Sequence, residues 1–184
     1  MPMPPPLKPG TLRAEQIILF RIGEQLFGLS SSSVQEVRGA DSLSGGATKI
    51  AAAGIDKVRA FVRRGQNTLF IVSGAAHFGL PAPDGILAFV LRNTRTALLV
   101  DSIERMTAMT RLQALPLSFC HEERQWYRGL TALDQTVVPV VRPEGFLSDD
   151  ELMTLDAALP PPELSNDEAD TEADQETDPG TELN

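Results

Sequence analysis

The side chains of this chain that could do chemistry are few, and the first is a carboxylate at the end of an apolar run. Residues 96–101 (TALLVD) have the pattern of a Walker B strand, in which Asp101 would bind a nucleotide-associated metal ion. That chemistry also needs a phosphate loop of the type G-x-x-x-x-G-K-[ST], which the sequence lacks. We therefore expect Asp101 to cap a turn or to orient a neighbouring loop.

Two residue pairs would suit nucleophilic catalysis by type but not by spacing. Ser73 and His77 lie in VSGAAHFG, which is not the G-x-S-x-G turn that exposes a hydrolase serine. Cys120 and His121 are adjacent, so their side chains diverge on an extended chain and make a poor nucleophile–base pair. Hydrolysis by Asp101, His77 or Cys120 remains a secondary hypothesis, and we predict no catalytic residues.

The sequence also contains no motif typical of cofactor binding, metal binding or membrane insertion. With Cys120 the only cysteine and His77 and His121 the only histidines, we predict neither a metal site nor a cofactor. The N-terminal MPMPPPLKPG has no apolar segment of the kind found in signal peptides. No run approaches the roughly 20 apolar residues of a membrane span. The expected protein is cytoplasmic, without direct membrane insertion.

The formal net charge of −9 is segregated along the 184 residues. From Asp149 onward there are 13 acidic residues and no Lys or Arg, so the first 148 residues hold 12 acidic residues against 16 basic ones. A mildly basic body with only 5% aromatic residues lacks the clustered cations and interleaved rings of a nucleic-acid binder. We expect no nucleic-acid partner and keep a small-barrel nucleic-acid binder as an alternative.

The elements that must position these side chains begin with a tight hairpin. Gly23-Glu24 has the first-position glycine that a type II′ turn needs, where φ is positive. A two-residue loop here sets Ile22 opposite Gln25 and Phe20 opposite Phe27. Because strand side chains alternate between faces, one face is predicted to be apolar, and its residues are Ile18, Phe20, Ile22, Phe27 and Leu29.

Three more hairpins are predicted from turn residues between apolar runs. They comprise residues 58–64 with 68–72, 86–91 with 96–100, and 128–133 with 136–141. Both strands around Asn93-Thr94 are apolar on both faces, so we expect them in the most buried part of the protein. Four hairpins favour closed barrels over an open sheet, because closure removes exposed edges.

The connecting segments are less regular. Residues 30–37 fit one or two helical turns with a serine cap, although 35–38 would equally enter a strand. Residues 40–54 are rich in Gly, Ala and Ser and are predicted as a loop.

The last folded element is predicted as a helix from Asp149 to about Leu159. Ser148 with Glu151 matches a capping box, and Leu147 with Leu152 matches a hydrophobic staple. The folded domain is thus predicted over residues 15–159, between a Pro-rich leader (1–14) and an acidic, disordered tail (160–184).

One group of charged residues is compatible with partner recognition. Arg59, Arg63 and Arg64 accompany Phe61 on the second hairpin, and Glu36 and Arg38 follow the first. Charges beside tight turns would form the polar rim of an interface, although ordinary solvated strand faces explain the same pattern. Similarly, Trp126-Tyr127 is either core packing at the start of a strand or an exposed interaction anchor.

Three segments in order resemble the CheW family of chemotaxis coupling adaptors. They are LFRIGEQLFGL with the following SSSSVQEVRG, RTALLVDSIERM, and WYRGLTALDQTVVPVVRPEGFLSDDEL. The resemblance covers about Glu15 to Leu155 and treats the residues after the RTALLVD strand as a turn.

This resemblance implies an all-β fold of two small five-stranded SH3-like barrels packed together, with short helices and a C-terminal helix. It also implies a non-enzymatic adaptor that couples the cytoplasmic tips of chemoreceptors to the regulatory domain of a CheA-type histidine kinase. Such an adaptor would be recruited to membrane receptor arrays. An alternative is a re-purposed barrel of this family in another signalling or motility complex.

The resemblance also assigns partner-binding residues. Receptor or kinase contact is implied for Val34, Glu36, Arg38, Gly39, Arg64 and Gly65. The last two match the end of the family's N-L-R-G motif, in which Val62 and Arg63 stand here where Asn and Leu are usual.

Overall fold

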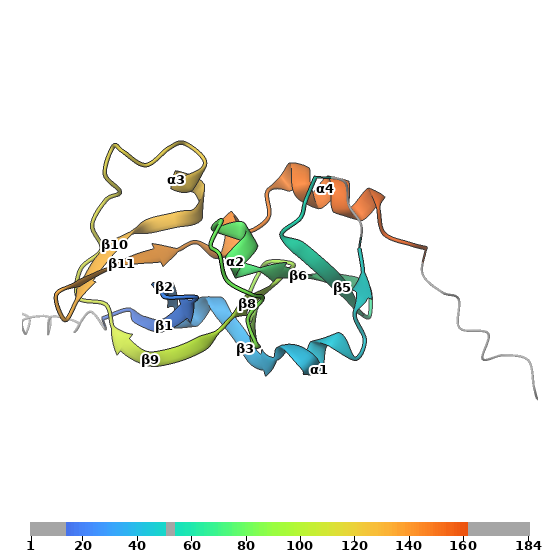
Figure 1. The fold of residues 1–184 in the computed structure, drawn as a ribbon, viewed down its shortest axis with the longest axis horizontal. Coiled ribbons are helices and arrows are strands. Elements are labelled where there is room, and N and C mark those ends of the chain that lie inside the picture. Colours follow the sequence, from blue (N-terminus) through green and yellow to red (C-terminus); the bar gives the residue numbers. More distant parts are fainter. Residues whose placement is uncertain (1–13, 51–53, 162–184) are drawn as a thin grey trace, which may run out of the picture.

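The computed structural model describes residues 14–50 and 54–161, whose strands form two sheets side by side along the long axis of the molecule (Figure 1). The first sheet has the order β10-β11-β2-β1-β9 and comprises β1 (Gln16–Ile22), β2 (Gln25–Ser30), β9 (Ser102–Ala108), β10 (Tyr127–Leu133) and β11 (Thr136–Val141). The second has the order β3-β7-β8-β6-β5-β4 and comprises β3 (Val34–Gly39), β4 (Thr48–Lys49), β5 (Val58–Arg64), β6 (Asn67–Ser73), β7 (Leu87–Leu91) and β8 (Thr96–Val100). The predicted class, two small packed β subdomains with few short helices, is confirmed.

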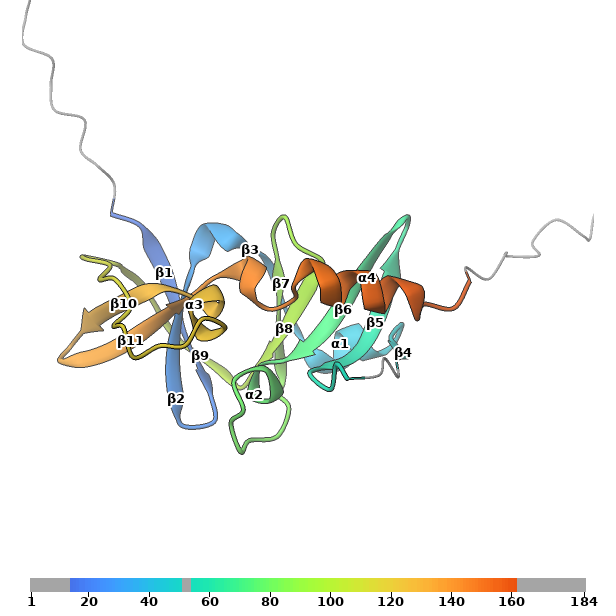
Figure 2. The same cartoon turned by 90° about the horizontal axis from the view of Figure 1, so that it is seen from above.

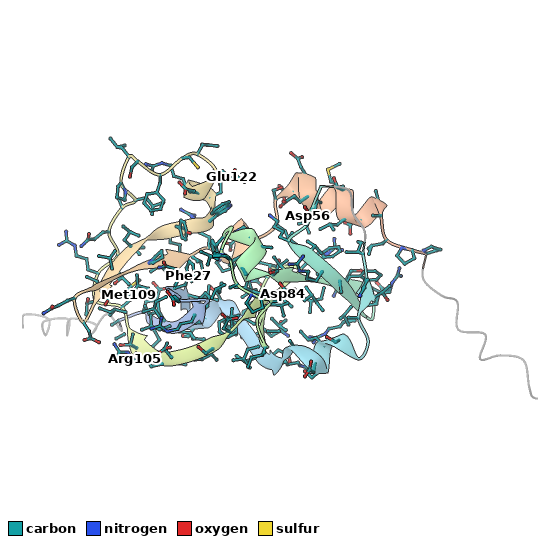
Figure 3. All side chains as sticks on the ribbon, viewed as in Figure 1. Phe27, Asp56, Asp84, Arg105, Met109 and Glu122 are labelled. Carbon is teal, nitrogen blue, oxygen red and sulfur yellow. The ribbon has the colours of Figure 1, made fainter. Side chains whose placement is uncertain are left out.

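The first hairpin has the predicted register. Ile22 pairs with Gln25 and Phe20 with Phe27, and Gly23 has φ +58° in the turn. All five residues of the predicted apolar face lie in one buried cluster. Figure 3 shows the position of Phe27 on the first sheet. The turn glycine and the alternation of side chains therefore suffice to explain this element.

The third predicted hairpin occupies the centre of the second sheet. β8 pairs antiparallel with β7 on one side and parallel with β6 on the other. All five residues of β8 are buried, as expected for a strand that is apolar on both faces.

The prediction of a loop over residues 40–54 is wrong in part. A short helix, α1 (Ala40–Ser44), begins directly after β3, and β4 adds a sixth, two-residue strand to a sheet expected to have five. Leu43 is buried against the second sheet and anchors this helix. Tertiary packing of one leucine thus overrides a Gly/Ala/Ser composition that favours a loop.

A strand was missed where the resemblance implied a turn. β9 begins one residue after β8 and pairs with β1 in the first sheet. Most of its side chains, including Glu104 and Arg105, are exposed, so no period-two apolar pattern marks it. Further along, Gln113 forms a bridge with Leu130 of β10, which curls this sheet towards closure.

Residues 30–37 combine the two predicted conformations. Ser31–Ser33 form a single 3₁₀ turn, and the chain then enters β3 at Val34. β3 pairs with β7 and is an edge strand of the second sheet.

The C-terminal helix α4 (Asp149–Ala157) lies across the second sheet (Figures 1 and 2). Its predicted capping box is present, since the Ser148 side chain accepts from the Glu151 N–H and the Glu151 side chain accepts from the Ser148 N–H. Leu155 of α4 is fully buried among side chains of β5 and β6. Three further short helical segments are α2 (Gly74–His77), α3 (Glu123–Trp126) and the 3₁₀ turn η2 (Pro143–Gly145).

The two predicted terminal segments fall almost entirely outside the described residues. Of the leader only Ala14 is described, and of the tail only Pro160 and Pro161.

Candidate functional site

The main polar feature among the predicted site residues is a carboxylate held by two arginines. Arg64 Nη1 donates to Glu36 Oε1 at 2.6 Å, and Arg38 Nε donates to Glu36 Oε2 at 2.9 Å. Glu36 and Arg38 lie on β3, whereas Arg64 ends β5, several strands away in the order of the second sheet. The curl of the sheet brings them together, and we call Glu36, Arg38 and Arg64 the Glu36 triad.

The Glu36 triad is partly exposed. The side chains of Glu36 and Arg64 retain 27% and 34% of their accessible surface. The hydrogen bond from Arg64 holds the pKa of Glu36 below its usual value, so this carboxylate is ionised at neutral pH. Ion pairs this exposed stabilise a fold by only about 0–1 kcal/mol. The triad therefore presents a fixed pattern of charge at the surface more than it stabilises the sheet.

The other three predicted site residues are Val34, Gly39 and Gly65, which lie on or directly after the strands that carry the triad. Val34 is half-buried and packs against a buried cluster to which both sheets contribute side chains. Gly39 precedes α1 as its N-cap, and apart from its chain neighbours no described residue has an atom within 4 Å of the position a Cβ would take there. Gly65 has φ +60° in the β5–β6 turn, a conformation that favours glycine. The structure thus brings three of the six predicted residues into contact.

The remaining arginines of the predicted polar rim fasten neighbouring segments instead. Arg59 makes a bidentate ion pair with Asp84, at 2.8 and 3.1 Å. Arg63 lies over the Phe61 ring, 5.8 Å from its centroid, and donates to the Pro160 carbonyl. These contacts tie β5 to the segments around Asp84 and Pro160, and Figure 3 shows Asp84 beside the second sheet.

A set of exposed apolar side chains was not recognised in the sequence. Val37 of β3, Ile103 and Met106 of β9, and Ile86 are all exposed. In the second sheet Gly39 pairs with Leu87, and Leu87 pairs with Val100. The chain leaves this sheet after Val100 and enters β9 of the first sheet. The exposed apolar side chains on these strands therefore lie near the junction of the two sheets. Ile103 and Met106 were missed because β9 itself was missed. Ile86 was predicted in a buried strand but lies exposed, one residue before β7 begins.

Asp101 does what the sequence predicted. Its Oδ2 accepts from the Gly23 N–H at 2.5 Å, and its own N–H donates to the Arg21 carbonyl at 2.9 Å. The carboxylate therefore orients the β1–β2 turn.

The residues considered for nucleophilic catalysis are not arranged as a nucleophile and its base. The Ser73 hydroxyl caps α2 by accepting from the Ala76 N–H at 3.1 Å. His77 is buried against Phe78, Trp126 and Phe146, with ring centroids 4.7, 4.7 and 5.0 Å away. Half-buried Trp126 thus contributes to packing.

Cys120 is exposed, and its thiol accepts from the Glu123 N–H at 3.5 Å. Within the described ranges, no group of three or more His, Cys, Asp or Glu side chains is placed to hold a metal ion. In the same part of the chain, no helix has both the length and the apolar character needed to cross a membrane.

Comparison with known proteins agrees with this architecture. The family model described as CheW-like domain matches residues 16–151. A probable chemotaxis protein CheW from Rhizobium etli is 29% identical over 143 residues, which cover 74% of this chain and 89% of that protein. The crystal structure of the scaffolding protein TtCheW from Thermoanaerobacter tengcongensis superposes with a TM-score of 0.63 at 14% identity, over 78% of this chain and 94% of the other. This chain belongs to the family of CheW-like domains.

Proposed function

We propose that the protein is a non-enzymatic chemotaxis adaptor that couples the cytoplasmic tips of chemoreceptors to the regulatory domain of a CheA-type histidine kinase. The proposal rests on family membership and on one observation, the exposed Glu36 triad held between β3 and β5. In this role the protein acts in the cytoplasm and is recruited to membrane receptor arrays by its partners. Its mechanism is positional, because it binds two partners at once and neither forms nor breaks covalent bonds.

Two surfaces would serve two partners. The Glu36 triad, with Gly39 and Gly65 beside it, offers charges whose geometry is set by paired strands, which suits a specific polar contact. The apolar side chains of Val37, Ile103 and Met106 offer a surface suited to the apolar face of a partner.

The charge distribution does not favour nucleic acid as the partner. Eight cationic side chains of the described residues are already paired with carboxylates: Arg21, Arg38, Lys57, Arg59, Arg64, Arg95, Arg105 and Arg128. Binding of a nucleic acid depends on net positive protein charge spread along its whole backbone. Pairing offsets that charge, even where a guanidinium nitrogen can still donate to a single carboxylate.

Calorimetry with the regulatory regions of the CheA-type kinases and with the cytoplasmic tips of the chemoreceptors of its own organism would test this proposal. We expect micromolar binding to one kinase. We also expect Glu36→Lys or Arg64→Ala to weaken binding to the kinase or to the receptor by at least about tenfold, about 1.4 kcal/mol. Arg105→Ala is the matched control, because Arg105 also makes an exposed ion pair, with Asp134 on the first sheet.

Thermal denaturation of the same variants separates binding from folding. The two triad variants should keep melting temperatures close to the wild type, since their ion pairs are exposed. A loss of stability equal to that of a core substitution, or unchanged binding to both partners, would contradict the proposed site. An absence of binding to every kinase and receptor tested would instead indicate a barrel re-used in another complex.

A further inference from the structure

A pocket of about 350 Å³ lies beside the Glu36 triad at one end of the second sheet. Its polar lining comes from Arg64, Arg95, Asn67, Asn93, Gln35 and two threonines, above a floor that includes Leu69. Among the described residues, none that lines this pocket is acidic. By contrast, the larger hollow of about 710 Å³ between α3, η2 and α4 is lined by four carboxylates.

The pocket lining has the chemistry of a carboxylate site. Guanidinium and side-chain amide groups are N–H donors, and the arginine fork matches a carboxylate geometrically. Arg64 uses only Nη1 for Glu36 among the described residues, so its other nitrogens remain able to donate. Arg95 already demonstrates this recognition, because it holds the Asp156 carboxylate through two bonds of 2.6 and 2.7 Å.

The surroundings of the pocket are also positively charged overall. Among residues 14–50 and 54–161, five arginines and two carboxylates lie at this end of the second sheet: Arg38, Arg63, Arg64, Arg92 and Arg95 with Glu36 and Asp156. Of these arginines, Arg63 and Arg92 donate only to backbone carbonyls within the described part of the chain. An anionic ligand would therefore be attracted to this end of the molecule.

The chain itself supplies an acidic segment at this place. Asp156 contacts Arg95, which lines the pocket, and the Pro160 carbonyl accepts from Arg63, next to Arg64. The 23 residues that follow Pro161 include nine acidic residues and no Lys or Arg. Extended chain spans about 3.3–3.6 Å per residue, so carboxylates only a few residues beyond Pro161 are within reach.

We infer that this pocket binds the acidic segment 163–182 of the same chain. A tethered segment has an effective concentration in the millimolar range, so a contact too weak to form between separate molecules is populated within one. Because Arg64 belongs both to the pocket and to the Glu36 triad, the bound segment would compete with a partner for that arginine. The test below needs no partner, so it is independent of the proposed function.

Paramagnetic relaxation enhancement in the full-length protein tests this inference. A nitroxide is attached at Thr181→Cys in a Cys120→Ser background, and amide signals of the ¹⁵N-labelled protein are followed at low and high salt. We expect the amides of Asn67 and Asn93 to lose intensity at about 0.03 M salt and to recover at about 0.5 M, where the charges are screened. Gln125 and Gly145, which line the acidic hollow, should be unaffected.

A charge-matched pair of variants makes the test specific. Asn67→Asp with Asn93→Asp keeps the side-chain shapes and places two carboxylates in the pocket, and aspartate tolerates the φ of +59° at position 93. This variant should abolish the broadening at the pocket, whereas Gln125→Glu in the acidic hollow should leave it intact.

Three results would overturn the inference. The first is an absence of broadening at the pocket. The second is broadening that survives both high salt and the Asn→Asp variant. The third is broadening of the ¹⁵N-labelled protein that appears only when the nitroxide is carried by a second molecule without ¹⁵N. The last would show that the pocket binds the acidic segment of another copy.

Discussion

His77 is the residue whose surroundings differ most from those its chemistry favours. It is 94% buried among aromatic rings, and neither ring nitrogen has a hydrogen-bond partner in the described structure. This burial, with the nearby charge of Lys57, lowers the pKa of His77 to about 3. The imidazole is therefore neutral in the folded protein, while in the unfolded chain it takes up a proton near its ordinary pKa of about 6.5.

Stability should consequently depend on pH through this one side chain. The folded-state pKa is depressed, so its contribution to stability is complete above about pH 6.5 and decreases as the pH falls towards 3. We expect a loss of about 2 kcal/mol between pH 7.5 and pH 5, measured by urea denaturation. His77→Phe should remove most of this loss, whereas substitution of the exposed His121 should not.

The carboxyls with lowered pKa do not obscure this effect. Those of Glu15, Glu36, Asp84 and Asp156 remain mostly ionised down to about pH 5 in both states. A pH slope of equal size in His77→Phe would contradict the assignment.

At the scale of elements, α2 lies where the two sheets meet, and Gly74 is its first residue. A Cβ on Gly74 would lie 2.5 Å from Ile22 Cδ1 of the first sheet and 2.7 Å from the Leu99 carbonyl oxygen of the second. The backbone oxygen has no flexible side chain to move aside, so close approach of these three segments requires glycine.

We therefore expect Gly74→Ala to destabilise the fold by about 1–3 kcal/mol, the usual cost of overpacking. Gly46→Ala is the control, because apart from its chain neighbours no described residue has an atom within 4 Å of the position of its Cβ. It should change stability by less than about 0.5 kcal/mol. Denaturant midpoints at constant m-value measure both. Equal losses in the two variants would rule out the steric explanation.

The elements that sequence reasoning predicted correctly are those with a local physical cause. The β1–β2 hairpin follows from Gly23 and the alternation beside it, and α4 follows from its capping box. β9 and α1 depend on distant partners, namely β1 and the pocket filled by Leu43, and they were missed. In the same way, sequence analysis groups Glu36, Arg38 and Arg64 as candidate partner-binding residues. It does not predict the hydrogen bond between Arg64 and Glu36, because that contact requires the curl of the whole sheet.

At the scale of the whole molecule, the described fold ends with α4. Leu155 of α4 is fully buried, whereas Pro160 and Pro161 are exposed. Ending the chain after Leu159 should therefore change the melting temperature by less than about 2 °C, and ending it after Ser148 should destabilise the protein by several times more. Calorimetric melting of the two truncations checks this. A large decrease for the first would mean that the segment beyond α4 contributes substantially to the fold.

The order of strands in the first sheet has a consequence for how the protein is made. Its strands β1 and β2 are synthesised first, but β9 to β11 arrive only after the whole second sheet has been translated. The strands of the second sheet are contiguous in the chain, so they can pair during translation. The edges of β1 and β2 stay unpaired until β9 and β11 have been synthesised. A nascent chain stalled after β8 would therefore expose those edges to other proteins, and translation speed across residues 102–141 should affect the yield of folded protein.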